Sequence, residues 1–114
     1  MKKETLVINA ELTKQIKQQA LQADRLRSNF NIHESPEEIQ RFINAIEPNS
    51  YIRPHQHNTP PKFETFIVLQ GRGGVIVFSD DGEIEDIKIL DSKKQQWGVE
   101  IPPGVMHTIL SLES

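Results

Sequence analysis

Three histidines and one glutamate have the residue types and spacing that could do chemistry. His55 and His57 are separated by one residue, so both imidazoles project to the same side where the backbone is extended. Glu64 opens the next apolar run, and His107 follows a Pro-Pro-Gly sequence near the C-terminus. Three neutral imidazoles and one carboxylate are ligands that suit a first-row transition metal. The sequence therefore predicts a site for one divalent transition-metal ion.

Metal coordination would also offset the unfavourable free energy of burying these polar side chains. Inward residues of antiparallel strands about 4.8 Å apart converge, and four such groups can reach one ion at bond lengths of about 2.0 to 2.2 Å. Burying three imidazoles without hydrogen-bond partners would be unfavourable, and an ion supplies the missing partner. The alternative is four unrelated polar residues. His33 lies far from the others in sequence and is interpreted as a surface or hydrogen-bonded histidine outside the site.

The ligand set alone chooses neither a metal nor a reaction. It accepts zinc, iron, manganese, nickel or copper. One or two open positions on such an ion can bind a substrate oxygen or lower the pKa of a bound water toward about 7. Isomerase, hydrolase and dioxygenase chemistry therefore all stay open.

Strand alternation places four further side chains on the faces that carry the ligands: Tyr51, Arg53, Lys62 and Phe66. A phenol, two cations and an aromatic ring suit a small anionic or sugar-like ligand. The alternative is that Arg53 and Lys62 are rim residues in water. The candidates for a catalytic role are Tyr51, Arg53 and Glu100, although an ordinary ion pair with a nearby arginine explains Glu100 equally well.

Length and composition limit the classes of protein to which the chain can belong. Its 114 residues predict one domain, with a strand, helix and connector over 1–33 and a β-barrel over 39–114. The formal net charge of −3 indicates neither nucleic acid nor a membrane surface as a partner. No apolar stretch approaches the roughly 20 residues of a membrane span, and the N-terminal apolar piece is too short for a signal peptide. Because cysteine is absent, a cytoplasmic protein is expected.

The elements that must position the ligands begin with a helix. Asn9 is a suitable N-cap after a short β-prone run at 5–8, and an apolar stripe follows at helical spacing: Leu12, Ile16, Ala20 and Ala23. Residues 25–33 show no clean period and are interpreted as a connector or pocket wall. Residues 35–38 form a helix-start signal, yet residues 39–46 also alternate as a strand would. We favour a strand, because a hairpin partner would help to anchor the His-x-His segment.

The rest of the chain predicts β-structure. Short β-prone runs are separated by glycine or proline turns and lie at residues 64–70, 74–78, 84–90, 97–101 and 106–112. The first three are expected to form a meander. Seven or eight short strands preceded by one amphipathic helix predict a mainly β fold, a small barrel or sandwich.

Taken together, the two histidine motifs resemble those of the cupin superfamily. Its first motif contains glycine, His-x-His, glutamate and glycine, and its second contains Pro-x-Gly and a histidine. The matching residues, in order, are His55, His57, Glu64, Gly71, Pro102, Gly104 and His107. Asn49 stands where the leading glycine would be, and six residues separate the second histidine from the glutamate. The resemblance implies a double-stranded β-helix, or jelly-roll, barrel in which His55, His57, Glu64 and His107 hold the metal.

More closely, the chain resembles the WbuC family of cupin-fold metalloproteins, which occur in bacteria and are often encoded with O-antigen and lipopolysaccharide biosynthesis genes. The resemblance covers nearly the whole chain and rests on residues 27–33, 40–45, 51–57, 61–64 and 98–104 with His107. It implies a metal-binding cupin whose ligand is a small carbohydrate-related or carboxylate metabolite. Family members run beyond Ser114, so barrel closure is expected to need another element or a partner chain, as in a homodimer.

Two further functions are consistent with the same residues. One is a non-catalytic module in which the metal helps to bind a small ligand or holds the fold together. The other is a metal-free sugar isomerase in which a histidine acts as the base. An open coordination position favours the enzyme, whereas a closed site formed by four protein ligands favours the structural role.

Overall fold

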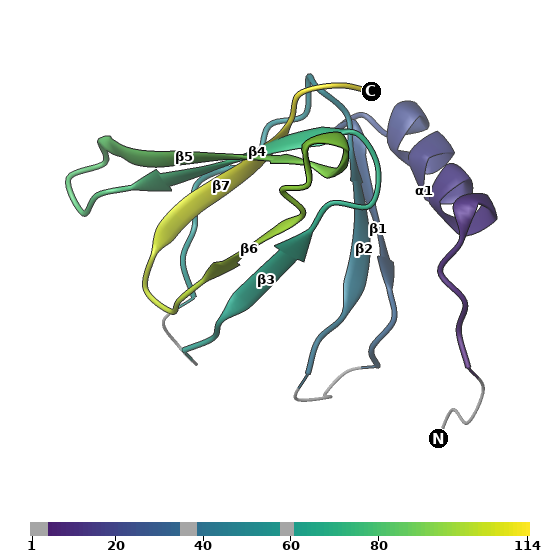
Figure 1. Ribbon diagram of the computed structural model, residues 1–114, viewed down its shortest axis with the longest axis horizontal. Coiled ribbons are helices and arrows are strands. Elements are labelled where there is room, and N and C mark those ends of the chain that lie inside the picture. The colour runs from purple at the N-terminus through teal and green to yellow at the C-terminus, as the bar shows by residue number, and fades with distance from the viewer. Residues whose placement is uncertain (1–4, 35–38, 58–60) are drawn as a thin grey trace. The chain divides into compact units, whose positions relative to one another are not determined.

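The computed structural model describes residues 5–34, 39–57 and 61–114. The chain divides by its internal contacts into two compact units, Met1–Ile46 and Glu47–Ser114. The first unit holds a helix and a two-stranded sheet, and the second holds five strands (Figure 1). The predicted mainly β fold with an N-terminal helix is therefore confirmed.

Helix α1 spans Ala10–Gln22 and begins where the sequence predicts. Asn9 is its N-cap, and the side-chain oxygen of Asn9 accepts a hydrogen bond of 3.0 Å from the backbone N–H of Leu12. Ile16 and Ala20, from the predicted apolar stripe, are buried. The expectation of a short strand at residues 5–8 is wrong, because these residues belong to no strand among those that the structure describes. In the described ranges no helix has the length and apolarity needed to cross a membrane.

The two strands of the first unit form an antiparallel hairpin against which α1 packs. Strand β1 is Arg27–Asn31, and strand β2 is Phe42–Ile46. The second strand confirms the preferred prediction over residues 42–46, whereas residues 39–41 are not in a strand. Strand β1 corrects the interpretation of residues 25–33 as a connector. Its polar sequence gives no strand signal, and the strand forms because it pairs with β2. The helix-start signal at 35–38 lies outside the described residues.

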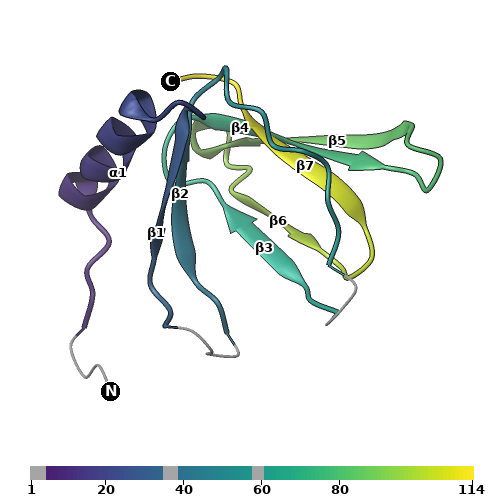
Figure 2. The same cartoon turned by 180° about the vertical axis from the view of Figure 1, so that it is seen from behind.

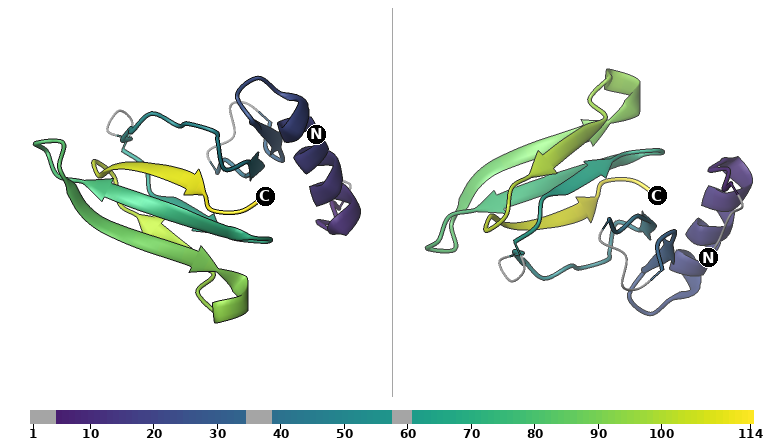
Figure 3. Two further views of the ribbon diagram at one scale, coloured as in Figure 1. Left: turned by 90° about the horizontal axis from the view of Figure 1, so that it is seen from above. Right: turned by 90° about the horizontal axis from the view of Figure 1, so that it is seen from below.

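The second unit consists of two antiparallel sheets, one with strand order β5-β4-β7 and one with β3-β6. Their bounds are β3 Glu64–Ile67, β4 Arg72–Phe78, β5 Ile84–Asp91, β6 Gly98–Ile101 and β7 Met106–Ser111. Figure 3 shows β4 between β5 and β7. Strands were predicted at these places. The expected meander is correct for β4 and β5, which pair with each other, and wrong for β3, which pairs with β6. Gly71, at φ 78°, lies between β3 and β4 and lets the chain turn into the other sheet.

The two sheets of the second unit pack face to face. Val75, Leu90 and Ile101 form the buried centre of this sandwich. Partly buried apolar residues from both sheets pack around it: Phe66, Val68, Val99, Val105 and Ile109. Both sheets are open along the part of the chain that the structure describes, so a closed barrel is not observed (Figure 2). The predicted polar loop after β5 contains one 3-10 turn, Ser92–Lys94.

Candidate metal centre

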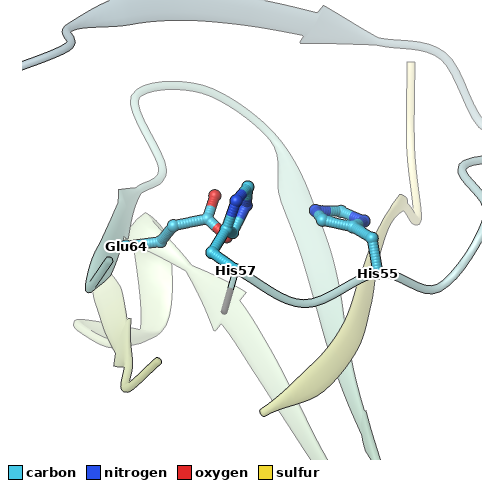
Figure 4. Close-up of side chains that lie close together, drawn as sticks. All are labelled: His55, His57 and Glu64. Atoms are coloured by element: carbon cyan, nitrogen blue, oxygen red, sulfur yellow. The ribbon is translucent and has the colours of Figure 1, made fainter. Parts of the chain in front are cut away.

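His55, His57 and Glu64 form a compact group of ligand atoms. One ligand atom from each residue can be chosen so that all three lie within 4.8 Å of one another. Figure 4 shows the carboxylate of Glu64 beside the ring of His57, with the ring of His55 across from them. Bonds of about 2.0 to 2.2 Å to one ion place ligand atoms roughly 3 to 4.4 Å apart. Small side-chain movements would therefore bring the three groups into coordination distance.

His107 reaches the same place from the opposite sheet. Its Nε2 lies 3.0 Å from Oε1 of Glu64, and its ring centroid is 4.4 Å from that of His55. It is outside the set in which all ligand atoms lie within 4.8 Å. Its side chain is only 1% exposed, so the contact with Glu64 is shielded from water. The four residues predicted as ligands are thus brought together.

Both sheets of the sandwich contribute to this arrangement. Glu64 is the first residue of β3, and His107 is the second residue of β7. The expected strand at the His-x-His segment is reduced to one bridge, in which His55, itself outside any strand, pairs with His107 of β7. That bridge attaches the segment to β7, while Glu64 approaches from β3. The candidate centre therefore lies between the two sheets of the second unit.

Local hydrogen bonds orient the rings of two histidines. Nδ1 of His55 lies 3.1 Å from the carbonyl oxygen of Arg53, and Nδ1 of His107 lies 2.8 Å from that of Val105. A carbonyl oxygen can only accept, so we assign the proton to Nδ1 in each ring. Nε2 is then left with a lone pair for an ion, which is the usual arrangement of a metal-binding histidine. Pro54 favours an extended backbone at Arg53 and so helps to fix the first carbonyl.

Two buried atoms at the centre have no hydrogen-bond partner among the described residues: Oε1 of Glu64 and Nε2 of His107. Oε1 lies 2.7 Å from Nε2 of His57 and 3.0 Å from Nε2 of His107, but neither contact has hydrogen-bond geometry. Unpaired buried polar atoms are uncommon and costly. A cation between the carboxylate and the imidazoles would satisfy both atoms, so the residues present fit a metal ion.

The electrostatics of the pair agree with its geometry. Burial acts to raise the pKa of Glu64, but the contact with His107 and the nearby imidazoles outweigh it and hold the pKa below its ordinary value. Burial acts to lower the pKa of His107, but the Glu64 carboxylate and the Val105 carbonyl outweigh it and raise that pKa. Each of the two groups therefore favours the charged form of the other.

Comparison with known families gives one match. Residues 8–90 match the family described as a domain of unknown function, DUF6016, which covers well over half of the chain. The chain belongs to the DUF6016 family. Comparisons with curated proteins and with solved structures found no match. The stretch shared with DUF6016 contains three of the four ligand candidates and ends before His107.

Among the other site candidates of this DUF6016 member, Phe66 has a ring contact with the centre. Its ring centroid is 6.2 Å from that of His107, in an edge-to-face arrangement. Arg53 is exposed, and its backbone carbonyl orients His55. Tyr51 is also exposed and, like Arg53, lies outside any strand. Lys62 is exposed two residues before Glu64.

Glu100 lies on the other face of its sheet. It pairs with Thr65 in the β3–β6 register, whereas Glu64 pairs with Ile101. Because successive strand residues point to opposite faces, the face of Glu64 and Ile101 is turned away from Glu100. Its carboxylate accepts a hydrogen bond of 3.4 Å from the hydroxyl of Thr65. This position separates Glu100 from the candidate centre.

Three contributors to the centre were missed in the sequence. The carbonyls of Arg53 and Val105, each two residues before a candidate ligand histidine, orient the imidazoles. Thr108, directly after His107, is buried and donates its hydroxyl to the carbonyl of Ile52. Backbone carbonyls leave no residue-type signal. A threonine that follows a ligand histidine on a strand is a signal only once its partner segment is known.

Proposed function

We propose that this protein is a metal-binding cupin that binds or acts on a small carbohydrate-related or carboxylate metabolite. The observation that carries the metal site is the buried contact between Oε1 of Glu64 and Nε2 of His107. Neither atom has a hydrogen-bond partner among the described residues, and two more imidazoles lie beside them. Three imidazoles and a carboxylate suit zinc, iron, manganese, nickel or copper.

The cupin part of the proposal is supported by motif order together with sheet arrangement. The first motif supplies His55, His57 and Glu64, and the second supplies His107 after Pro102 and Gly104. The motifs meet between two antiparallel sheets, as a double-stranded β-helix requires. The resemblance to WbuC proteins further supports a bacterial cytoplasmic role in surface-polysaccharide biosynthesis.

The proposed roles of the residues follow from their burial. His107 and Glu64 would form the inner side of the centre, since their side chains are 1% and 22% exposed. His57 is 37% exposed, so a small molecule would approach from its side. A bound divalent ion would supply Lewis-acid chemistry at that open side. Isomerase, hydrolase and dioxygenase reactions are all compatible with these roles.

Charge and shape around the centre suggest the class of ligand. Arg53 and Lys62 are exposed cations close in sequence to His55 and Glu64. Exposed cations near a metal attract anionic groups such as carboxylates. Phe66 offers an apolar surface beside His107, which suits the ring of a sugar.

Elemental analysis of protein purified without a histidine tag tests the metal site. We expect close to one equivalent of a transition metal, and His57→Ala should lose most of it. His33→Ala is the matched control, because His33 lies in the first unit and its Nδ1 accepts a hydrogen bond of 3.0 Å from the N–H of Arg41. Less than about a tenth of an equivalent in the wild-type protein would reject the proposal and favour a metal-free isomerase.

A structural metal is the second candidate, and the small core favours it. Among the described residues of the second unit, the buried hydrophobic side chains are Val75, Leu90 and Ile101, and an ion would cross-link the two sheets. Cobalt(II) spectra distinguish the two roles. A spectrum that shifts when acetate or azide is added shows an open coordination position and favours the enzyme or binding protein. A spectrum that is unchanged by either anion favours a closed structural site.

A further inference from the structure

We infer that Thr108 is a positioning residue that holds His55 in the proposed metal centre. The inference rests on the proposed metal function and names a part of it that the ligand motifs do not contain. Thr108 follows His107 on β7, and its side chain therefore points to the opposite face of the sheet. It has no access to the ion and acts through the backbone of the His-x-His segment.

The contact itself is buried and specific. Thr108 is 8% exposed, and its hydroxyl donates a hydrogen bond to the carbonyl oxygen of Ile52. Water competes only weakly for a buried hydrogen bond. Removing the Thr108 hydroxyl therefore leaves the carbonyl of Ile52 without an equivalent partner. Valine has nearly the same shape as threonine and lacks only the donor. The contribution of this hydroxyl can therefore be separated from packing.

The position of Ile52 explains why the bond bears on His55. In the part of the chain that the structure describes, residues 52–54 belong to no strand. The next residue, Arg53, provides the carbonyl that accepts from Nδ1 of His55. His55 itself is attached to His107 by two backbone hydrogen bonds of 2.9 Å. Thr108 thus fixes the start of a four-residue link whose end carries a ligand.

Adjacent residues of β7 hold the two ends of this link. The backbone of His107 pairs with His55, and the side chain of Thr108 bonds to Ile52. The carbonyl of Arg53 lies between these two attachments, so its direction, and with it the imidazole of His55, is set by both. If the Thr108 hydroxyl is removed, the bridge between His55 and His107 remains. The carbonyl of Arg53 can then adopt more orientations. We therefore expect a weakened ligand in a protein that still folds.

Cobalt(II) titration, followed by visible absorption, measures the effect with the metal alone. Thr108→Val should bind cobalt about 10-fold more weakly than the wild type, as is usual when a group that orients a ligand is removed. Thr108→Ser retains the donor and should restore binding to within about threefold. Thr65→Val is the matched control, because Thr65 is exposed and its hydroxyl faces Glu100 at 3.4 Å.

A double-mutant cycle identifies the ligand through which Thr108 acts. In a His55→Ala background, adding Thr108→Val should change cobalt affinity by less than about twofold, because the ligand that it positions is gone. In a His57→Ala background the loss of about 10-fold should persist. A merely structural role would give the same loss in both backgrounds and would leave the cobalt spectrum of Thr108→Val unchanged.

The outcomes separate this inference from the proposed function. Wild-type protein that takes up no cobalt overturns both. Wild-type protein that binds cobalt, with Thr108→Val binding equally well, overturns only the role of Thr108. An equal loss in the His55→Ala and His57→Ala backgrounds also overturns it. If Thr108→Val fails to fold, Thr108→Ala and Thr108→Ser are compared by the same cycle, and equal cobalt affinity in these two variants rejects the inference.

Discussion

His55 and His107 exchange two backbone hydrogen bonds, each 2.9 Å long, in which each residue donates to the carbonyl oxygen of the other. This bridge places the first and the last ligand candidates side by side, with ring centroids 4.4 Å apart. The pairing is made by backbone atoms. It joins the two halves of the histidine pattern.

Loss of His107 is expected to disturb both the fold and the site. His107 is 1% exposed, so His107→Ala leaves a cavity and an uncompensated carboxylate at Glu64. We expect metal affinity to fall at least 100-fold, and the free energy of unfolding of the metal-free protein to fall by about 2 kcal/mol. Metal titration and urea denaturation in a chelator measure the two effects. Retention of full metal affinity would remove His107 from the ligand set.

Replacing Glu64 with glutamine tests the electrostatic link to His107. Glu64→Gln keeps the shape of the side chain and removes the charge that raises the pKa of His107. We expect the pKa of His107 in the metal-free variant to fall, because burial then acts with less opposition. Imidazole resonances followed by NMR across a pH titration report this change. An unchanged pKa would show that the two side chains do not interact in solution.

The stability of the metal-free protein should depend on pH in a defined way. The raised pKa of His107 contributes stability that is present at low pH and is lost as pH rises through its folded value. The lowered pKa of Glu64 contributes stability that is present above its ordinary value of 4.5 and is lost as pH falls through its folded value. The two contributions overlap between 4.5 and the ordinary histidine value of 6.5. Thermal denaturation across pH should show the maximum of this contribution there.

Bound metal should stabilise the protein more as pH rises, the reverse of the trend expected for the metal-free protein. A proton on His107 competes with the ion, so the stabilisation by metal should be larger at pH 8 than at pH 6. At a free metal concentration about 1,000 times Kd, binding adds roughly 4 kcal/mol to the free energy of unfolding. Melting curves with zinc and with a chelator at both pH values provide the comparison. Equal shifts at the two pH values would mean that His107 is not a ligand.

Metal removal should loosen one part of the second unit first. The segment at residues 51–57 is attached to β7 by the His55 bridge, and an ion would also tie it to Glu64. Hydrogen exchange with and without chelator should therefore show the largest loss of protection at His55 and His107. The β4–β5 hairpin, whose ladder contains no ligand, is the internal control and should change little.

Gly98 provides a test of the β3–β6 pairing on which the position of Glu64 depends. A Cβ at this residue would lie 2.7 Å from the carbonyl oxygen of Phe66 and 3.0 Å from Cδ1 of Ile67. Gly98→Ala should push β6 away from β3 and lower the free energy of unfolding by about 1 to 3 kcal/mol. Denaturation in the presence of a chelator measures this loss, and Thr65→Ala, on the exposed face of the same sheet, is the control. An unchanged free energy of unfolding in Gly98→Ala would contradict the close pairing of β3 with β6.

The sequence by itself determined the features that arise from neighbours along the chain. Asn9 caps α1 through Leu12, three residues away, so the helix start could be predicted. The turn at Gly82, which has a φ of 85°, similarly set the hairpin between β4 and β5. The ligand candidates were recognisable because their residue types and spacings are unusual among polar residues. Each of these signals is complete within a short stretch.

Tertiary structure alone decided which segments meet. The strand at Arg27–Asn31 has a polar sequence and becomes ordered through its partner Phe42–Ile46. The pairing of β3 with β6 in place of β4 depends on long-range packing of the core, which no local pattern encodes. The contact between Glu64 and His107, and the bond from Thr108 to Ile52, join residues far apart in the chain. Their free energy is gained only when these distant segments come together in the fold, and this is why the sequence indicated the ligand candidates while the fold determined how they are arranged.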